Sequence, residues 1–257
     1  MSIIHTSGLQ VAIEKKPILT DIHANIDKGD LIGLIGPNGS GKSTLLRTLA
    51  GLQRITKGTV TVAGNELHTY KTKERAALMS YVPQETKVNF HFRAREIVLM
   101  GRHVHTSRFA TETKEDIRCA ELALQETNSL HLADQSILNL SGGQRQLIFL
   151  AKALAQETPI MLLDEPISAL DIHFQLHILE LLQKRRNQGA TIIAVLHDLN
   201  LAARYCNKLM LIKDGQMLQF GNPEHVLTKQ LLKDAYHVNT HIRFDDATDS
   251  VTVTAFR

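Results

Sequence analysis

The sequence predicts an α/β fold with a mainly parallel central sheet. Short apolar runs alternate with segments of helical periodicity along the 257 residues, a pattern typical of strands joined by crossover helices. A second observation is a glycine-rich loop at residues 36–43, between an apolar run and a helical pattern. Because 43% of the residues are hydrophobic, the chain can bury a sizeable core, and we expect a single domain over residues 1–257.

In chain order, the first segments predict an antiparallel β portion. The expected strands are residues 9–13, 18–26 and 59–62. Turn-forming residues at 57–58 and 63–65 separate them from their neighbours.

The core of the sheet is predicted from short apolar runs that each end in polar residues. The expected strands are residues 31–35, 80–82, 160–163 and 191–196. A helix at 43–50 follows the glycine loop, so its N–H groups and positive dipole end face that loop. In such sheets the chemistry collects at the strand ends.

Helical periodicity dominates residues 85–156, which we expect to form an inserted helical subdomain. Within it, residues 112–128 predict a helix whose apolar stripe contains Ile117, Ala120 and Leu124.

The remaining segments complete the organisation. Residues 1–84 and 157–235 are expected to form the catalytic core. Residues 236–257 alternate like strands on either side of a turn-rich link at 246–249, which predicts a small C-terminal hairpin appendage.

Composition narrows the function classes. The 29 basic and 26 acidic side chains give a net charge of +3 without the clustered basic face of a nucleic-acid binder, so no nucleic-acid partner is expected. With only Cys119 and Cys206, no disulfide framework is expected. No stretch approaches the roughly 18–20 apolar residues of a membrane span, and the first residues lack a secretory signal. We expect a soluble, cytosolic chain.

The glycine loop predicts phosphate binding, because its glycines expose backbone N–H groups to phosphate oxygens and its lysine adds a positive charge. Lys42 is expected to pair with the β- and γ-phosphates, and the Ser43 hydroxyl to ligate Mg²⁺. The residues expected to bind nucleotide here are Gly36, Pro37, Asn38, Gly39, Ser40, Gly41, Lys42, Ser43 and Thr44.

Two further motifs follow the phosphate loop. One is the run Leu140, Ser141, Gly142, Gly143 and Gln144, in which Ser141 predicts the N-cap of a helix through Ala155. The other is the apolar strand at 160–163, which leads into Asp164, Glu165 and Pro166. In this order, the three segments resemble those of the ATP-binding cassette (ABC) ATPases, from about residue 9 to 220.

The resemblance implies roles for single residues. Asp164 would hold Mg²⁺ through water, and Glu165 would be the catalytic carboxylate that polarises the attacking water. Gln84 would contact Mg²⁺ and that water, and His197 would bond the γ-phosphate as the switch histidine. Asp171 ends a loop through which two cassettes communicate. The alternatives are an ordinary helix N-cap for the acidic pair and an ordinary surface or core side chain for the histidine.

In this family, the signature run covers the γ-phosphate bound by a second subunit. The resemblance therefore implies a head-to-tail dimer that clamps two ATP molecules, with Ser141, Gly142, Gly143 and Gln144 acting across the interface. Mg²⁺ and ATP are the implied cofactors, and a second copy of this chain or a similar cassette is the implied partner.

One departure from the family concerns adenine. Relatives stack the base on an aromatic side chain upstream of the phosphate loop, but no aromatic residue precedes Tyr70. Ile13 lies near the expected place and would pack on the base without stacking.

Two other segments resemble cassettes that energise importers of iron chelates (siderophores), haem and cobalamin: residues 88–108 and 195–206. The resemblance implies a transmembrane permease as partner, an indirect periplasmic or surface substrate-binding protein, and a peripheral location on the cytoplasmic face of the inner or plasma membrane. The three cargoes are not distinguished. The alternatives are an ATPase subunit of an iron–sulfur cluster assembly scaffold and an ABC ATPase that acts on nucleic acid or ribosomes.

Overall fold

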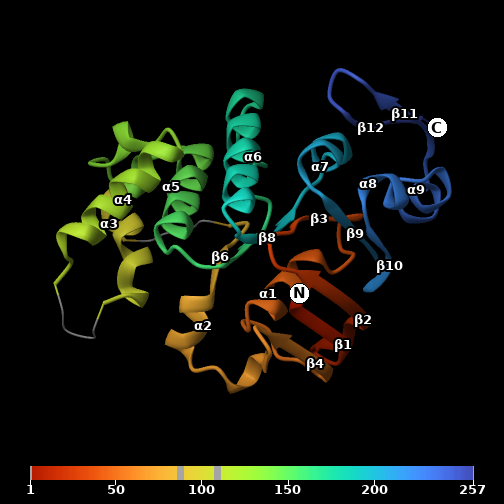
Figure 1. Ribbon diagram of the computed structural model, residues 1–257, viewed down its shortest axis with the longest axis horizontal. Helices are drawn as coiled ribbons and strands as arrows, with labels where there is room; N and C mark the ends of the chain where they lie inside the picture. The colour runs from red at the N-terminus through yellow and green to blue at the C-terminus, as the bar shows by residue number, and fades with distance from the viewer. Residues whose placement is uncertain (1, 86–89, 107–110, 257) are drawn as a thin grey trace. The chain divides into compact units, whose positions relative to one another are not determined.

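The computed structural model describes residues 2–85, 90–106 and 111–256. The chain forms two compact units, shown in Figure 1. Unit 1 comprises Met1–Tyr70 and Gln183–Arg257, and unit 2 comprises Lys71–Leu182. The subdomain boundaries that we place near residues 84 and 156 stay predictions.

Unit 1 begins with an antiparallel sheet, in the order β2-β1-β4-β5. Its strands are β1 (Ser2–Ile13), β2 (Lys16–Asp27), β4 (Lys57–Val62) and β5 (Asn65–Glu66). The expected antiparallel portion is confirmed, with longer strands. The expected turn at 57–58 is wrong, because Lys57 pairs with Gln10 of β1 and thereby extends β4.

The second sheet of unit 1 has the strand order β10-β9-β3-β8. Its strands are β3 (Leu31–Ile35), β8 (Thr191–Val195), β9 (Lys208–Lys213) and β10 (Gln216–Gly221). Strand β3 runs parallel to both β8 and β9, whereas β10 is antiparallel to β9. Every residue of β3 and β8 is buried, as expected of parallel strands covered on both faces. The mainly parallel core is confirmed.

The remaining elements of unit 1 are short. They are α1 (Lys42–Leu49), the 3₁₀ helix η1 (Leu67–Thr69), α7 (Leu199–Tyr205), α8 (Pro223–Val226), α9 (Lys229–Tyr236), β11 (Asn239–Asp245) and β12 (Ser250–Phe256). The antiparallel pair β11–β12 confirms the C-terminal hairpin. The Asn200 side chain of α7 fastens it, because its amide donates to the Val253 carbonyl (3.3 Å) and accepts from the Val253 N–H (2.7 Å).

Unit 2 combines one parallel strand pair with a helical region. The pair is β6 (Met79–Val82) and β7 (Ile160–Leu163). Its helices are α2 (Thr72–Leu78), α3 (Ala94–Leu99), η2 (Met100–Val104), α4 (Lys114–Glu126), η3 (Leu130–Leu132), η4 (Ile137–Asn139) and α5 (Gly142–Ala155). Helix α6 (Ile172–Asn187) contains the boundary between the units. Helices α3, α4 and α5 pack on one another (Figure 1), which confirms the inserted helical region.

One position of the predicted stripe on α4 is wrong. Ala120 and Leu124 are buried, but Ile117 is 43% exposed. The buried face instead contains Asp116, whose side chain is 5% exposed. A carboxylate replaces an apolar residue on this face because a buried cation pairs with it.

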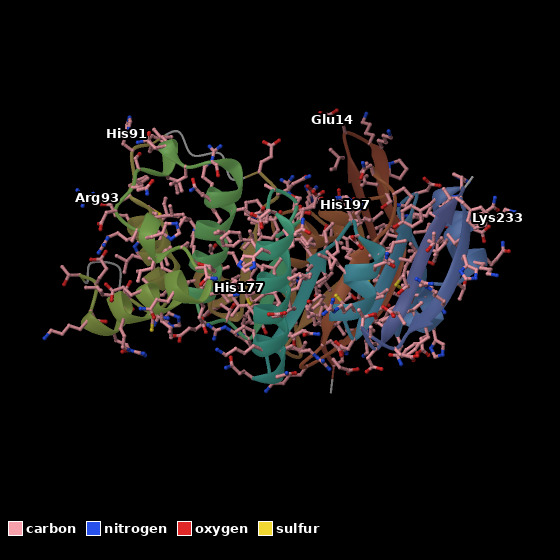
Figure 2. The ribbon with its side chains drawn as sticks, turned by 90° about the horizontal axis from the view of Figure 1, so that it is seen from above. Glu14, His91, Arg93, His177, His197 and Lys233 are labelled. Atoms are coloured by element: carbon pink, nitrogen blue, oxygen red, sulfur yellow. The ribbon has the colours of Figure 1, made fainter. Side chains whose placement is uncertain are left out.

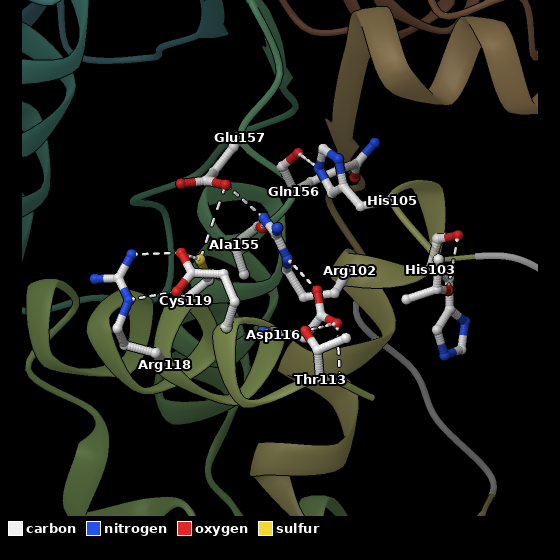
Figure 3. Close-up of polar contacts among 12 residues, drawn as sticks. Arg102, His103, His105, Thr113, Asp116, Arg118, Cys119, Ala155, Gln156 and Glu157 are labelled. Atoms are coloured by element: carbon white, nitrogen blue, oxygen red, sulfur yellow. Dashed lines mark hydrogen bonds and ion pairs between the residues drawn. The ribbon is translucent and has the colours of Figure 1, made fainter. Parts of the chain in front are cut away.

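That cation is Arg102 of η2, whose contacts Figure 3 shows. Its guanidinium donates to the Asp116 carboxylate at 3.1 Å, to the Ala155 carbonyl at 2.7 Å and to the Glu157 carboxylate at 2.6 Å. Ala155 is the last residue of α5, so the positive charge sits at the negative end of that helix dipole. Arg102 thereby fixes η2, α4 and the end of α5 to one another.

Two further features concern the cysteines and the possibility of a membrane-spanning helix. Cys119 and Cys206 are free and buried, and burial raises the pKa of Cys206 to about 12, so this thiol stays protonated at neutral pH. Among the described residues, no helix combines the length and apolarity needed to cross a membrane.

The pair of Arg102 and Asp116 predicts a pH dependence of stability. Hydrogen bonds from the Thr113 hydroxyl and N–H, together with Arg102, lower the pKa of Asp116 from 3.8 to about 2. A carboxyl whose folded pKa is depressed stabilises the fold above its unfolded pKa, and this contribution is lost as the pH falls through 3.8 toward about 2. Asp116→Asn should lower the free energy of unfolding at neutral pH by about 2–3 kcal/mol, the scale of that pKa shift, since Arg102 loses one carboxylate partner and keeps Glu157.

Urea denaturation at several pH values checks this prediction. The difference between wild type and Asp116→Asn should shrink across the interval from 3.8 to about 2. Glu121→Gln, a change at an exposed carboxyl of the same helix, is the control and should leave stability almost unchanged. A constant difference across that interval would contradict the assigned role of the Asp116 charge.

Candidate functional site

The predicted phosphate loop lies in unit 1 between β3 and α1. Gly41 is the N-cap of α1, with φ of 103°, and Gly39 has φ of 77°. Both values fall in the region that glycine adopts without steric cost. The loop therefore leads a buried strand into a helix N-terminus, the arrangement in which backbone N–H groups face an anion.

Gly36 is the most constrained residue of this loop. Its φ is 145°, and a Cβ built on it would lie 2.0 Å from the Ile212 carbonyl oxygen of β9. The Gly36 backbone also interacts with the Tyr236 hydroxyl at the end of α9. Burial raises the pKa of Tyr236 to about 12, so the hydroxyl remains neutral. The strand, the loop and the last turn of α9 are thus packed around one glycine.

Lys42 and Ser40 supply the polar side chains of the loop. The Lys42 ammonium donates to the carbonyl oxygens of Gly36 (2.7 Å) and Pro37 (2.8 Å), and the residue is 6% exposed. The loop is wrapped around this amine. The Ser40 hydroxyl is buried and has no hydrogen-bond partner among the described residues. An unsatisfied buried hydroxyl beside a fixed ammonium fits a phosphate group, which accepts hydrogen bonds from both.

His197 lies beside the phosphate loop in the same unit. It follows β8, the parallel neighbour of β3, and the Leu196 N–H donates to the Leu34 carbonyl at 3.2 Å. Both strands therefore release their chains at the same edge of the sheet, one into the loop and one into His197. The side chain is exposed and is labelled in Figure 2.

The position considered for adenine lies at the β1–β2 hairpin of unit 1. Ile13 is the last residue of β1 and is 41% exposed. Its neighbour Glu14 marks the hairpin tip in Figure 2. An exposed apolar side chain can pack against a base without aromatic stacking. The contact between Ile13 and adenine stays a prediction.

In unit 2, the acidic pair follows β7 and Gln84 follows β6. The two strands are parallel, and the Asp164 N–H donates to the Val82 carbonyl at 2.9 Å. Asp164 is 3% exposed, whereas Glu165 is half-buried. Glu165 has φ of 53°, a left-handed conformation that costs a non-glycine residue about 1–3 kcal/mol and occurs preferentially at functional sites.

The run from Ser141 to Gln144 opens α5 in unit 2. Ser141 is the expected N-cap: its hydroxyl accepts from the Gln144 N–H at 3.2 Å, and the Gln144 side-chain oxygen accepts from the Ser141 N–H at 2.9 Å. This reciprocal capping box fixes the first turn. Because α5 is 14 residues long, its N-terminus carries a full helix dipole that favours an anion.

A loop packs against this helix start. A Cβ on Gly143 would lie 2.6 Å from the Ala169 carbonyl oxygen. Asp171, the end of that loop, accepts from the Phe174 N–H at 3.1 Å in the first turn of α6. A cavity of about 270 Å³ adjoins the contact, lined by residues that include Ser141, Gly143, Gln144, Ala169 and Asp171.

The structure therefore brings the predicted residues together in two groups, each within one unit. The first contains the phosphate loop and His197. The second contains Gln84, Asp164, Glu165, the α5 N-terminus and Asp171. Sequence reasoning missed Tyr236 and Gln146. Gln146 had one signal, a polar residue beside the apolar run at 147–151 of a predicted helix.

Metal chemistry is limited by the donor set. Within the described ranges, no group of three or more His, Cys, Asp or Glu side chains could hold a metal ion by themselves. Among the histidines, a ring nitrogen of His177 on α6 lies 2.7 Å from the Glu126 carbonyl oxygen. This contact gives the His177 side chain a structural role in unit 2. A hydroxyl, a carboxylate and an amide oxygen at the predicted positions are hard donors. They fit Mg²⁺, which proteins hold through few side chains together with substrate phosphates.

Residues 19–168 match the family model described as ABC transporter. The cobalamin import ATP-binding protein BtuD of Halobacterium salinarum is 41% identical over 98% of this chain, and the chain spans 63% of its length. The iron(3+)-hydroxamate import ATP-binding protein FhuC of Bacillus subtilis is 38% identical over 97% of this chain and 93% of that protein.

Solved structures agree with these relatives. A metal-chelate type ABC transporter in an inward-facing conformation superposes with a TM-score of 0.85 and 30% identity, covering 100% of this chain and 98% of that one. A dimeric, post-hydrolysis ATP-binding cassette bound to ADP and phosphate gives a TM-score of 0.78 and 28% identity, covering 86% and 98% of the two chains.

The two glycines of the α5 N-terminus predict opposite responses to alanine. Gly143→Ala should lower the free energy of unfolding by about 1–3 kcal/mol, because the new methyl group overpacks the Ala169 carbonyl. Gly142→Ala should be neutral or slightly stabilising, since nothing lies within 4 Å of its Cβ position and alanine favours a helix. Thermal unfolding of both variants checks the contact, and equal effects would show that the loop does not pack as described.

Proposed function

Because the chain belongs to the ABC transporter family, we propose that it is the ATP-binding and ATP-hydrolysing subunit of an importer. Its permease would be a separate membrane protein, and its cargo an iron chelate, haem or cobalamin. The observation that carries the proposal is the similarity, along almost the entire chain, to import ATP-binding proteins. The names of those relatives specify different cargoes. They therefore support an importer ATPase but do not identify its cargo. They favour import over iron–sulfur cluster assembly.

Phosphate binding is proposed for residues 36–44. The positive charge of Lys42 would pair with the β- and γ-phosphates. The Ser40 hydroxyl would donate a hydrogen bond to a phosphate oxygen. The backbone N–H groups at the start of α1 contribute the helix dipole. Asn38, Gly39, Gly41 and Thr44 belong to the same proposed contact surface.

Three oxygen donors are proposed to hold Mg²⁺. Ser43 offers a hydroxyl, Gln84 an amide oxygen and Asp164 a carboxylate through water. When bound, the ion neutralises charge on the transferred phosphoryl group. Asp164 suits this role, because a buried carboxylate favours a strong cation partner.

Hydrolysis is proposed to depend on Glu165 and His197. Glu165 orients the attacking water and accepts its hydrogen bond as the oxygen approaches the γ-phosphorus. His197 donates a hydrogen bond to the γ-phosphate. The left-handed backbone of Glu165 supports this proposal, because such strain persists where the surroundings fix a functional geometry.

A second copy of the chain is the proposed partner at the nucleotide. The capped N-terminus of α5 presents Ser141, Gly142, Gly143 and Gln144 to an anion, and in the head-to-tail arrangement that anion is the γ-phosphate bound by the other copy. Asp171 lies on the loop beside this surface. ATP would then hold two copies together, and phosphate release would separate them.

The permease is proposed to contact the helical region. Residues 88–108 carry the resemblance to importers; of these, 88, 89, 107 and 108 lie outside the described residues. Within the described part, Phe90 is 69% exposed and contacts Phe92 edge-on, with 6.3 Å between ring centroids. Exposed aromatic pairs are typical anchors for a partner helix. Through the permease, the chain would sit peripherally on the cytoplasmic face of the membrane, and the substrate-binding protein would interact indirectly.

Glu165→Gln tests the ATPase and the dimer together. The variant should hydrolyse ATP at least about 100-fold more slowly, because the water loses its carboxylate partner, while ATP binding is retained. ATP with Mg²⁺ should therefore convert it to a stable dimer, which size-exclusion chromatography with light scattering detects. Lys42→Ala, which weakens phosphate binding, is the control and should stay monomeric. Wild-type phosphate release by Glu165→Gln would reject its role.

Phe90→Ser tests the permease contact. When the variant is co-expressed with its membrane permease, the amount that co-purifies from membranes should fall at least about tenfold, as expected for loss of an aromatic anchor. Nucleotide binding should be unchanged. Leu52→Ser, which alters a 53% exposed apolar residue of unit 1, is the matched control. Equal recovery of the two variants would argue against this surface.

A further inference from the structure

Gln146 lies on α5, one turn beyond Gly143, and is 4% exposed. Its side-chain N–H group donates to the Glu165 carbonyl oxygen, and its side-chain oxygen accepts from the Ala169 N–H at 3.1 Å. Both ends of one buried amide are thus bound to the backbone of the loop that begins with Glu165. A buried amide of this kind is costly unless its hydrogen bonds are satisfied, so its geometry is tightly specified.

The loop at 165–170 also makes hydrogen bonds within itself and to α6. The Glu165 carbonyl also accepts from the N–H and hydroxyl of Ser168, at 3.4 and 3.2 Å. From α6, Gln175 donates to the carbonyl oxygens of Ile167 and Leu170. Gln146 is the member of this group that ties Glu165, the residue with the left-handed backbone, to α5.

Two contacts therefore join α5 to this loop on one helix face, since residues three apart are neighbours on a helix. The first is Gly143 against the Ala169 carbonyl. The second is Gln146, which bridges Glu165 and Ala169. A shift of the α5 N-terminus is consequently passed to the backbone of Glu165 rather than absorbed by a gap.

We infer that Gln146 is a positioning residue that links the two nucleotide sites of the dimer. The inference rests on the proposed function, in which the α5 N-terminus closes over the partner copy's ATP while Glu165 serves the ATP of its own chain. Closure of one site moves α5, and Gln146 carries that movement to the carboxylate of the other site. Hydrolysis at one site then depends on occupancy of both.

The link explains why a glutamine is needed at this position. A leucine or methionine would fill the space but would leave the Glu165 carbonyl and the Ala169 N–H with one partner fewer. An ionised carboxylate would accept from Ala169 but repel the Glu165 carbonyl. The amide of glutamine donates at one end and accepts at the other, on a flexible side chain of this length.

The test uses the full-length chain and the variant Gln146→Met, which keeps the length of the side chain and removes both hydrogen bonds. The ATPase kcat should fall by about 10- to 100-fold, the scale expected when a catalytic group is misplaced by about 1 Å. ATP affinity should change by less than about twofold, because no phosphate contact is altered. We expect the Hill coefficient for ATP to exceed one in wild type and to fall to one in the variant, as the coupling between two sites is removed.

Gln156→Met is the matched control. Gln156 is the C-cap of the same helix and donates to the Ala76 and Met79 carbonyl oxygens at 2.6 and 3.2 Å, so its loss costs similar hydrogen bonds far from Glu165. It should lower stability and leave the Hill coefficient unchanged. If Gln146→Met does not fold, Gln146→Glu gives the same readouts, since it keeps the Ala169 contact and loses the Glu165 contact.

The outcomes distinguish a failure of the proposed function from a failure of the role inferred for Gln146. Wild-type chain that does not hydrolyse ATP would overturn the proposed function, and this inference with it. A wild-type enzyme whose kcat and Hill coefficient survive Gln146→Met would overturn the inference alone. Loss of both properties in Gln156→Met as well would also overturn it, because the effect would then reflect general loosening of α5.

Discussion

The loops that carry the predicted phosphate-binding residues and the acidic pair depend on the parallel pairing of buried strands. Parallel neighbours release their chains at the same edge of a sheet, so β3 and β8 place the phosphate loop beside His197 in unit 1. In unit 2, β6 and β7 place Gln84 beside the acidic pair in the same way. The strands themselves contribute no chemistry. Their residues, most of them apolar and buried, fix the positions from which polar side chains act.

Helix α5 is fastened at both ends and in its middle. Its first turn is closed by the Ser141 capping box, its last carbonyl is bound by Arg102, and Gln146 joins it to the loop after β7. These contacts couple the position of α5 to that of its neighbours. In the importer proposed above, this coupling would connect the region around η2 with the N-terminus of α5.

Much of this organisation was predictable from the sequence. The sheet classes, the helical region and the C-terminal hairpin follow from hydrophobic periodicity, and the phosphate loop and the α5 cap follow from local backbone chemistry. The residues that the sequence patterns misplaced or missed share one physical cause. Asp116 is buried because Arg102, 14 residues away, neutralises it, and Tyr236 reaches Gly36 only through the fold. Periodicity describes one element at a time, so partners distant in sequence are invisible to it.

The Gln146 bridge has a consequence for how such a link is preserved during evolution. Its partners are a carbonyl oxygen and an N–H of the backbone, which every residue type except proline can provide. Substitutions at positions 165 and 169 would leave these atoms in place, so they require no compensating change at position 146. Statistical methods that detect contacts through correlated substitutions would therefore overlook this connection, however strongly selection maintains it.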